Sequence, residues 1–460
     1  MASGRICLWL LFMTITQVVG EDIQSMIMSL MIDSKFQCAN TSCLPFINVF
    51  TSNIMNCQVA CLTQSQCRAA TFHRSTFNCE LFDNMLNQNE SILADIDAVS
   101  MNVISGTRFP SDQMTSTTTS SSTTTTTTGK LFKTSQVIEK RLCSLSSQSS
   151  WSQTATTIFG SQSGTPGSNL SFLSSPIGMY YDGFNNMLFV ADSGNQRILQ
   201  FSLDNSPSVA IVIAGSNGYG CNMNQFEAPY GIGVDSFGRL YVSDFYCSQV
   251  VIFPSNSNST TSGTLFSSVG LATSISINPL TVSFDDDIYV VSYNDSAVYK
   301  FVGGNTTAMI AAGGNGNGYA LNQLSGPVGA YYDYLYTNSL YVADSGNHRV
   351  LKFPSGSTNA TYGTVVAGGN GAGSGANQLN YPRSIIVDSS GTLYIADTNN
   401  NRIQRWLPNA SNGTTVAGGI PGTASDQLYF LETVLFDKYG NLLVSDRYNN
   451  RIQMFNLTTC

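Results

Sequence analysis

Hydrophobic runs separated by short polar turns follow one another at regular spacing between Pro176 and Cys460. The segment LYIADTNNNRIQRW from Leu393 is typical, because an apolar run ending at Asp397 is followed by a polar turn and a second apolar run from Arg402. Such short runs, rich in β-branched and aromatic residues, indicate strands. In this segment the pattern predicts four consecutive antiparallel strands, at 384–388, 392–396, 402–406 and 413–417.

The same pattern occurs six times, about every fifty residues. The six segments are LFVADSGNQRILQF, LYVSDFYCSQVVIF, IYVVSYNDSAVYKF, LYVADSGNHRVLKF, LYIADTNNNRIQRW and LLVSDRYNNRIQMF, which begin at residues 188, 240, 288, 340, 393 and 442. This period is typical of a four-stranded propeller blade. The chain is therefore predicted to be mainly β, with a six-bladed β-propeller over 151–460. The blades are expected to start near 176, 229, 277, 327, 382 and 431.

The last repeat ends at Phe455 and lacks an outer strand. Its missing strand is expected at 154–160, because Thr156-Thr-Ile-Phe-Gly160 resembles the outer strands of the other repeats. Closing blade six with this segment would remove an open sheet edge. Cys143 and Cys460 flank the closure and could form a disulfide across it, free thiols being the alternative. Cys221 and Cys247 fall in loops on one face of the second blade and form a second candidate pair.

The repeated V-A-D and N-x-R-I segments resemble the NHL repeat family. That resemblance implies the propeller but not one particular activity. A related amidating lyase uses several zinc-binding histidines, whereas His348 is the propeller's one histidine. Calcium-dependent lactonase propellers remain an alternative, since their ligands are oxygens. Asp285, Asp286 and Asp287 could hold calcium or form a solvated turn.

An Asp and an Arg recur together in four repeats. The third repeat has Ser292 and Ala297 in their place, and the second pairs Asp244 with Gln249. Joint loss indicates structural ion pairs rather than a catalytic set, since an unpaired buried charge is costly. The pairs are Asp192 with Arg197, Asp344 with Arg349, Asp397 with Arg402, and Asp446 with Arg451.

Charge and compartment narrow the function classes. The 460-residue chain has a formal net charge of -8, and only 10% of its residues are charged, which argues against nucleic-acid binding. Residues 1–20 read as a secretory signal peptide, with a signal anchor as the alternative, and no later segment predicts a membrane span. Ten cysteines remain after Cys7, and the chain holds ten N-x-[S/T] sequons. A secreted, disulfide-bonded glycoprotein is expected.

The N-terminal part divides into a cysteine-dense unit at 33–110 and a linker and lead-in at 111–150, which contains a run of Thr and Ser. The spacing of Cys57, Cys61, Cys67 and Cys79 resembles the PAN/apple module. That resemblance implies a short helix at 56–63 and bonds Cys57–Cys79 and Cys61–Cys67. The remaining pair, Cys38 with Cys43, departs from the apple pattern. His73 and Arg74 are exposed candidates for ligand contact, or ordinary hairpin residues.

A noncatalytic binding or adhesion role, with an extracellular protein or glycan as partner, is favoured over an enzyme. The alternatives are a calcium-dependent hydrolase or lactonase and a structural matrix component. No catalytic, metal or cofactor residue is assigned, although calcium stays possible. The candidate binding face is the one carrying the loops that enter each blade, and its aromatic residues could instead pack neighbouring loops. They are Tyr219, Phe245, Tyr246, Tyr293, Tyr319 and Tyr448.

Overall fold

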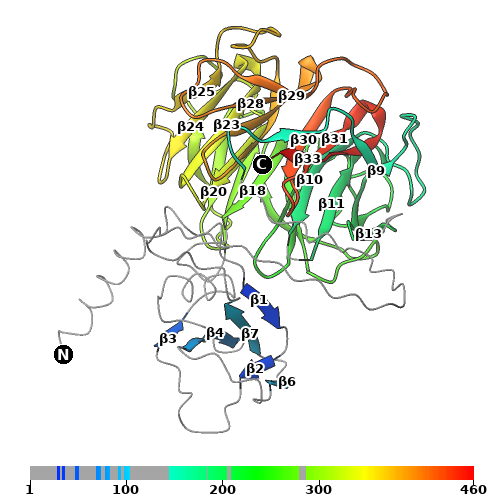
Figure 1. Cartoon of the computed structure of the whole chain (residues 1–460), viewed down its shortest axis with the longest axis vertical. Helices are drawn as coiled ribbons and strands as arrows, with labels where there is room; N and C mark the ends of the chain where they lie inside the picture. Colours follow the sequence, from blue (N-terminus) through cyan, green and yellow to red (C-terminus); the bar gives the residue numbers. More distant parts are fainter. Residues whose placement is uncertain are drawn as a thin grey trace, which may run out of the picture. The chain divides into compact units, whose positions relative to one another are not determined.

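The chain divides into two compact units, Met1–Leu142 and Cys143–Cys460, in a computed structural model (Figure 1). The structure describes the strands between residues 28 and 103, and residues 145–459 apart from 184, 205–208 and 279–285. Within these residues no helix has both the length and the apolar character needed to cross a membrane.

In the first unit, the described strands form two antiparallel sheets. The larger has the order β1-β7-β4-β5-β3, and β2 pairs with β6. The neighbouring strands β4 and β5 are separated by residues 74–77. The strands are β1 (Met28–Met31), β2 (Ser34–Phe36), β3 (Ile47–Phe50), β4 (Ala69–His73), β5 (Asn78–Phe82), β6 (Ile92–Ala94) and β7 (Ala98–Val103).

The second unit is a six-bladed propeller, which confirms the predicted fold class. Each blade is a four-stranded antiparallel sheet. Blades one to three comprise β10 (Pro176–Asp182), β11 (Met187–Asp192), β12 (Arg197–Ser202) and β13 (Ile211–Gly215); β14 (Pro229–Val234), β15 (Leu240–Asp244), β16 (Gln249–Phe253) and β17 (Thr264–Ser268); and β18 (Ala272–Asn278), β19 (Asp287–Ser292), β20 (Ala297–Phe301) and β21 (Met309–Gly313).

Blades four to six repeat the plan. They comprise β22 (Gly329–Asp333), β23 (Ser339–Asp344), β24 (Arg349–Pro354) and β25 (Thr364–Gly368); β26 (Pro382–Val387), β27 (Leu393–Asp397), β28 (Arg402–Trp406) and β29 (Thr414–Gly418); and β30 (Leu431–Phe436), β31 (Leu442–Asp446), β32 (Arg451–Phe455) and β9 (Thr156–Gly160). The first strand of each blade is innermost, and successive inner strands contact one another until β30 meets β10.

Blade six is closed by the N-terminal strand β9, which pairs antiparallel with β32. Phe159 of β9 is buried and stacks on Phe201 of blade one, with ring centroids 4.4 Å apart. A second pairing joins β8 (Ser150–Trp151) to β33 (Leu457–Thr459), and the sequence pattern did not indicate it. The two ends of the propeller are therefore held together by two strand pairs, and the outer edge of β32 is paired.

The third blade begins earlier than expected. Its inner strand starts at Ala272 rather than near residue 277, because only residues 269–271 separate it from β17. The other entry loops are longer and contain the Gly-rich and Asn-rich segments that mark a boundary in the sequence. Blade three lacks this signal. Its inner strand also lacks the Pro-x-Gly sequence with which the inner strands of blades one and two begin.

Candidate binding face

The turn between the second and third strand of a blade has one conformation in blades one, four, five and six. It starts at the Asp that recurs at the end of the second strand, forms a short 3-10 turn, and ends on a residue with left-handed backbone. The left-handed residues have φ between 50° and 54°. Asn tolerates this conformation better than most residues, which explains two of the four identities. They are Gln196, His348, Asn401 and Asn450.

The Arg of each ion pair fastens the loop that enters its blade. Arg349 donates its Nε–H to Asp344 at 2.7 Å, and its Nη groups donate to the carbonyls of Tyr319, Ala320 and Gln323 at 2.8, 3.0 and 3.3 Å. Asp344 in turn accepts the backbone N–H of Ser325. The pair is buried and ties residues 319–325 of the loop to the blade.

The other three expected pairs repeat this arrangement. Their Nε–Oδ2 distances are 2.7, 2.7 and 2.8 Å, for Asp192–Arg197, Asp397–Arg402 and Asp446–Arg451. Each Arg also donates to three carbonyls of its own entry loop, and Arg451 donates in addition to the carbonyl of Gln162 in the neighbouring entry loop. Four Arg side chains thus hold four surface loops by charge-assisted hydrogen bonds, which is a structural role.

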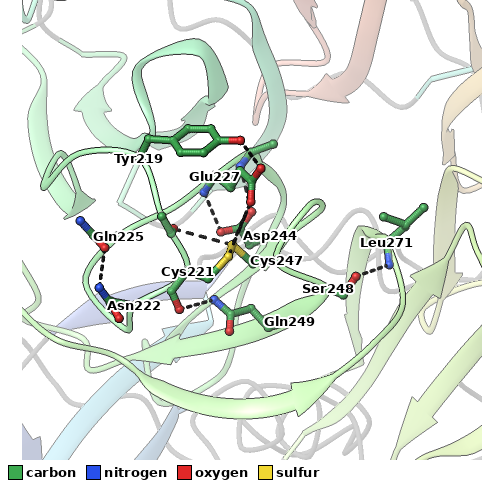
Figure 2. Close-up of a disulfide and its surroundings, with 12 residues drawn as sticks. Tyr219, Cys221, Asn222, Gln225, Glu227, Asp244, Cys247, Ser248, Gln249 and Leu271 are labelled. Atoms are coloured by element: carbon green, nitrogen blue, oxygen red, sulfur yellow. Dashed lines mark hydrogen bonds between the residues drawn. A yellow bond between two sulfur atoms is a disulfide. The ribbon is translucent and has the colours of Figure 1, made fainter.

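Blade two uses a different fastening (Figure 2). A disulfide joins Cys221 of the entry loop to Cys247 of the turn, the pair expected from the loop positions, and Gln249 donates to the carbonyl of Cys221 at 3.3 Å. Asp244 accepts the backbone N–H groups of Glu227 and Ala228 at 2.9 and 2.8 Å. The disulfide and Gln249 therefore take the place of the missing Arg.

Blade three needs no such fastening because its entry loop has three residues. Ser292 stands at the Asp position and donates to the carbonyl of Gly270 at 2.7 Å, while Ala297 stands at the Arg position. Joint loss of Asp and Arg therefore follows from the short loop.

Exposed aromatic side chains gather on the face that carries the entry loops and these turns. Nine aromatic side chains are exposed in the described part of the chain, and only Phe237 and Tyr362 lie in loops of the opposite face. The other seven come from blades two to six and their entry loops. They are Tyr219, Tyr246, Tyr293, Tyr319, Tyr381, Tyr429 and Tyr448.

Part of this face forms a continuous series of contacts that we call the aromatic row: Tyr293, Phe245, Tyr230, Phe430, Tyr448 and Tyr429. Neighbouring ring centroids in its first half are 6.2 and 5.0 Å apart, and those in its second half are 4.6 and 5.2 Å apart. The halves meet at Arg383, whose guanidinium lies close to the Tyr230 hydroxyl and 5.0 Å from the Phe430 ring centroid. Tyr230 and Arg383 belong to blades two and five, so this contact crosses the propeller axis.

Charged residues lie at the same axial end. Arg383, Glu432 and Arg447, which we call the axial charge cluster, come from β26, β30 and the last turn of blade six. Arg383 Nη1 lies 3.0 and 3.2 Å from the two Glu432 oxygens, and Arg447 Nη1 lies 2.6 Å from one of them. Two cations thus share one buried carboxylate.

The pKa values of the two Arg residues keep both side chains charged. Burial is the largest single effect and lowers the pKa of Arg383 and of Arg447, but Glu432 and Tyr230 together outweigh it, so both pKa values lie above the usual value for Arg. Burial is also the main cause that raises the pKa of Tyr230, and Glu432 adds to it. At neutral pH the face therefore presents two guanidinium groups beside a neutral phenol.

The predicted aromatic residues have different surroundings. Tyr293 and Tyr448 belong to the aromatic row and are exposed, whereas Phe245 is half-buried within it. Tyr246 contacts the edge of Phe245. Tyr219 and Tyr319 lie on entry loops. The Tyr219 hydroxyl donates a hydrogen bond to the Glu227 carboxylate, and the Tyr319 hydroxyl donates one to the carbonyl of Gly369.

Several other expectations concern side chains or segments outside the described residues. They are the signal peptide, the linker, the 56–63 helix, His73, Arg74 and the cysteine pairs Cys57–Cys79, Cys61–Cys67, Cys38–Cys43 and Cys143–Cys460.

The acidic triplet is engaged in protein contacts where it is described. Asp286 accepts the backbone N–H and the hydroxyl of Ser236, and Asp287 pairs with Lys300 at 2.7 Å, while Asp285 lies outside the described residues. One group of three potential metal ligands occurs in the described part of the chain, Cys221, Glu227 and Cys247. Its two sulfurs are bonded to each other, so Glu227 is the one anionic ligand that the group offers.

Tyr230, Phe430, Arg383, Glu432 and Arg447 were not found from the sequence. An alignment of the inner strands would have marked three of them. At the position that follows Pro176, Pro229, Ala272, Pro327, Pro382 or Leu431, the six blades carry Ile177, Tyr230, Thr273, Val328, Arg383 and Glu432. A charged residue therefore occurs at this position only in the adjacent blades five and six.

Fold and sequence together define the class. The PAN domain family matches residues 28–105 and the NHL repeat family matches residues 379–406. The chain therefore joins a PAN domain match at residues 28–105 to a six-bladed β-propeller that contains an NHL repeat match.

Curated relatives match only part of it. NHL repeat-containing protein 2 of Bos taurus is 34% identical over 125 residues, which is 25% of this chain and 17% of that protein. The Homo sapiens protein of the same name is 33% identical over 123 residues, with the same coverage. This chain thus spans less than a fifth of the length of these relatives.

Solved structures share the fold. An auxiliary nutrient binding protein from Bacteroides thetaiotaomicron has a TM-score of 0.51 at 15% identity, covering 68% of this chain and 78% of its own. A structural genomics protein of unknown function from the same organism has a TM-score of 0.51 at 12% identity, covering 85% and 91%. At these identities the likeness shows the fold alone.

Proposed function

We propose that this chain is a secreted, noncatalytic binding or adhesion glycoprotein, and that the propeller face with the entry loops recognises an extracellular protein or glycan. The observation that carries this proposal is the one-sided distribution of exposed aromatic side chains: of the nine in the described part of the chain, seven lie on one face of the propeller. Tyr and Arg are the side chains that most often dominate binding energy at recognition surfaces.

The loops on this face suit recognition because they are held rigidly. Four are fastened by buried Arg side chains and one by the Cys221–Cys247 disulfide. A surface that is already ordered loses less conformational entropy when it binds. A PAN domain and a propeller in one chain also offer two binding modules, whose joint engagement raises avidity. The disulfide and the PAN domain support an extracellular setting.

The test is binding of the full chain to glycan and extracellular-protein arrays, with and without calcium. Tyr293→Ala and Tyr448→Ala alter the aromatic row, and Tyr362→Ala is the matched control because Tyr362 is 67% exposed on the opposite face. The proposal expects a specific signal that both row variants weaken and the control preserves. A blank array contradicts it, as does ester or lactone turnover that chelation abolishes, which would favour the calcium-dependent hydrolase.

A further inference from the structure

The axial charge cluster has one positive charge in excess. The Glu432 side chain is 2% exposed and is paired with both Arg383 and Arg447, whose side chains are 20% and 22% exposed. The nearest carboxylate along the chain, Asp446, is already engaged by Arg451. The remaining four residues at the same inner-strand position are uncharged: Ile177, Tyr230, Thr273 and Val328.

The two Arg residues also have hydrogen-bond donors without acceptors. The Nε–H of Arg383 and the Nε–H of Arg447 are buried and have no hydrogen-bond partner in the described part of the chain. A buried donor without a partner costs about 1–3 kcal/mol, so such groups in a folded protein call for a specific explanation. Both guanidinium groups use Nη1 for Glu432, and each is a planar fork able to bind a second anion.

Aromatic rings flank these cations. The Phe430 ring centroid lies 5.0 Å from Arg383 and 5.8 Å from Arg447, and the Tyr448 ring centroid lies 5.5 Å from Arg447. Tyr448 is stacked on Phe430 and is exposed. An anion that reached the guanidinium groups would therefore sit beside an exposed ring.

We propose that the axial charge cluster binds the carboxylate of an acidic sugar residue at the end of a glycan, with the sugar ring resting on Tyr448. The inference rests on the proposed function and names the ligand class of its binding face. The carboxylate is held by Arg383 and Arg447 through charge-assisted hydrogen bonds, and the aromatic row contacts the less polar side of the sugar.

Two other anionic partners fit less well. A polyanion would be repelled by the protein as a whole, because the chain has a net charge of -8. The single excess positive charge at this site is too small to offset that repulsion. A peptide that binds by strand addition or through its terminal carboxylate needs backbone partners, but the nearby N–H groups of Tyr429, Phe430 and Tyr448 already donate to Asp446, Asn401 and Tyr429.

The experiment is calorimetric titration of the full chain with three probes: a glucuronate-terminated oligosaccharide, its glucose-terminated counterpart, and an acidic peptide of similar size. Arg447→Gln removes the excess charge while Arg383 still pairs with Glu432. Glu432→Gln has the opposite effect and leaves both cations without a protein carboxylate. Lys438→Gln is the control, since it makes the same charge change in the turn between β30 and β31 at the opposite end of the blade.

We expect the glucuronate probe to bind at least about 10-fold more tightly than the glucose probe. Arg447→Gln should weaken it by about 10- to 100-fold, the range for one charge-assisted hydrogen-bonded contact. Glu432→Gln should strengthen it, and Lys438→Gln should leave it unchanged. If Arg447→Gln fails to fold, Arg447→Lys keeps the charge without the fork and should weaken binding by about 10-fold.

Equal affinity for the two sugars overturns the inference, as does an unchanged affinity in Arg447→Gln or a preference for the acidic peptide. Binding of neutral glycans or proteins that depends on Tyr293 and Tyr448 would retain the proposed function while removing this inference. No binding on any array removes both.

Discussion

Removal of Arg349 tests whether the ion pairs act as structural fasteners. In Arg349→Ala, Asp344 stays fully buried with one partner fewer, and the carbonyls of Tyr319, Ala320 and Gln323 lose their donor. Removing one partner of a buried ion pair costs about 3–5 kcal/mol, because the other charge is left uncompensated. The free energy of unfolding should fall by this amount, measured by urea denaturation of the full chain.

The third blade supplies the matched control. Asp344→Ser combined with Arg349→Ala reproduces the residues Ser292 and Ala297 of that blade and leaves no orphaned carboxylate. The double variant should therefore be more stable than Arg349→Ala by about 1–3 kcal/mol, the usual penalty for an unpaired buried polar group.

Two results would refute this reasoning. One is a loss below about 1 kcal/mol in Arg349→Ala, the level of an exposed pair. The other is a double variant that is less stable than the single one, which would mean that Asp344 contributes independently of Arg349.

Three further expectations follow from single sites. Replacing Cys221 and Cys247 by Ser should lower the free energy of unfolding by about 3–4 kcal/mol in the chain-entropy model, given their sequence separation of 26, whereas a loss under about 1 kcal/mol would contradict a stabilising role. Phe159→Ala should cost about 3–5 kcal/mol because Phe159 is 6% exposed in the strand that closes blade six; an unchanged urea midpoint would show that the closure is dispensable. Burial lowers the pKa of His348 below 6.5, so its contribution to stability is present above that pH and is lost as pH falls through the folded-state pKa. Proton NMR titration of the chain's two histidines measures the pKa of His348. A value above 6.5 would contradict the predicted effect of burial.

The internal repetition made most of the propeller predictable. Six aligned copies locate the strands, and the absence of an outer strand after Phe455 pointed to Thr156–Gly160, which does pair with β32. The joint loss of Asp and Arg in blade three pointed to a paired structural role. The sequence did not show why blade three can lose both, because that depends on the length of the entry loop beside the pair.

The axial charge cluster was harder to predict because its members are far apart in the sequence. Tyr230, Arg383 and Glu432 occupy one position of three inner strands, and Arg447 comes from a turn. Only closure of the ring brings blade two opposite blade five and places these side chains at one axial end. Sequence reasoning looked for repeated residues, whereas this cluster consists of residues that break the repeat.

The most direct test of the binding face is hydrogen exchange of the full chain with and without the tightest ligand found on the arrays. The account expects protection at 228–232, 243–248, 291–296, 428–433 and 445–450, which carry the aromatic row and two members of the axial charge cluster. Protection confined to the opposite face, near Phe237 and Tyr362, or to residues 28–103, would contradict the assignment of this propeller face as the binding surface.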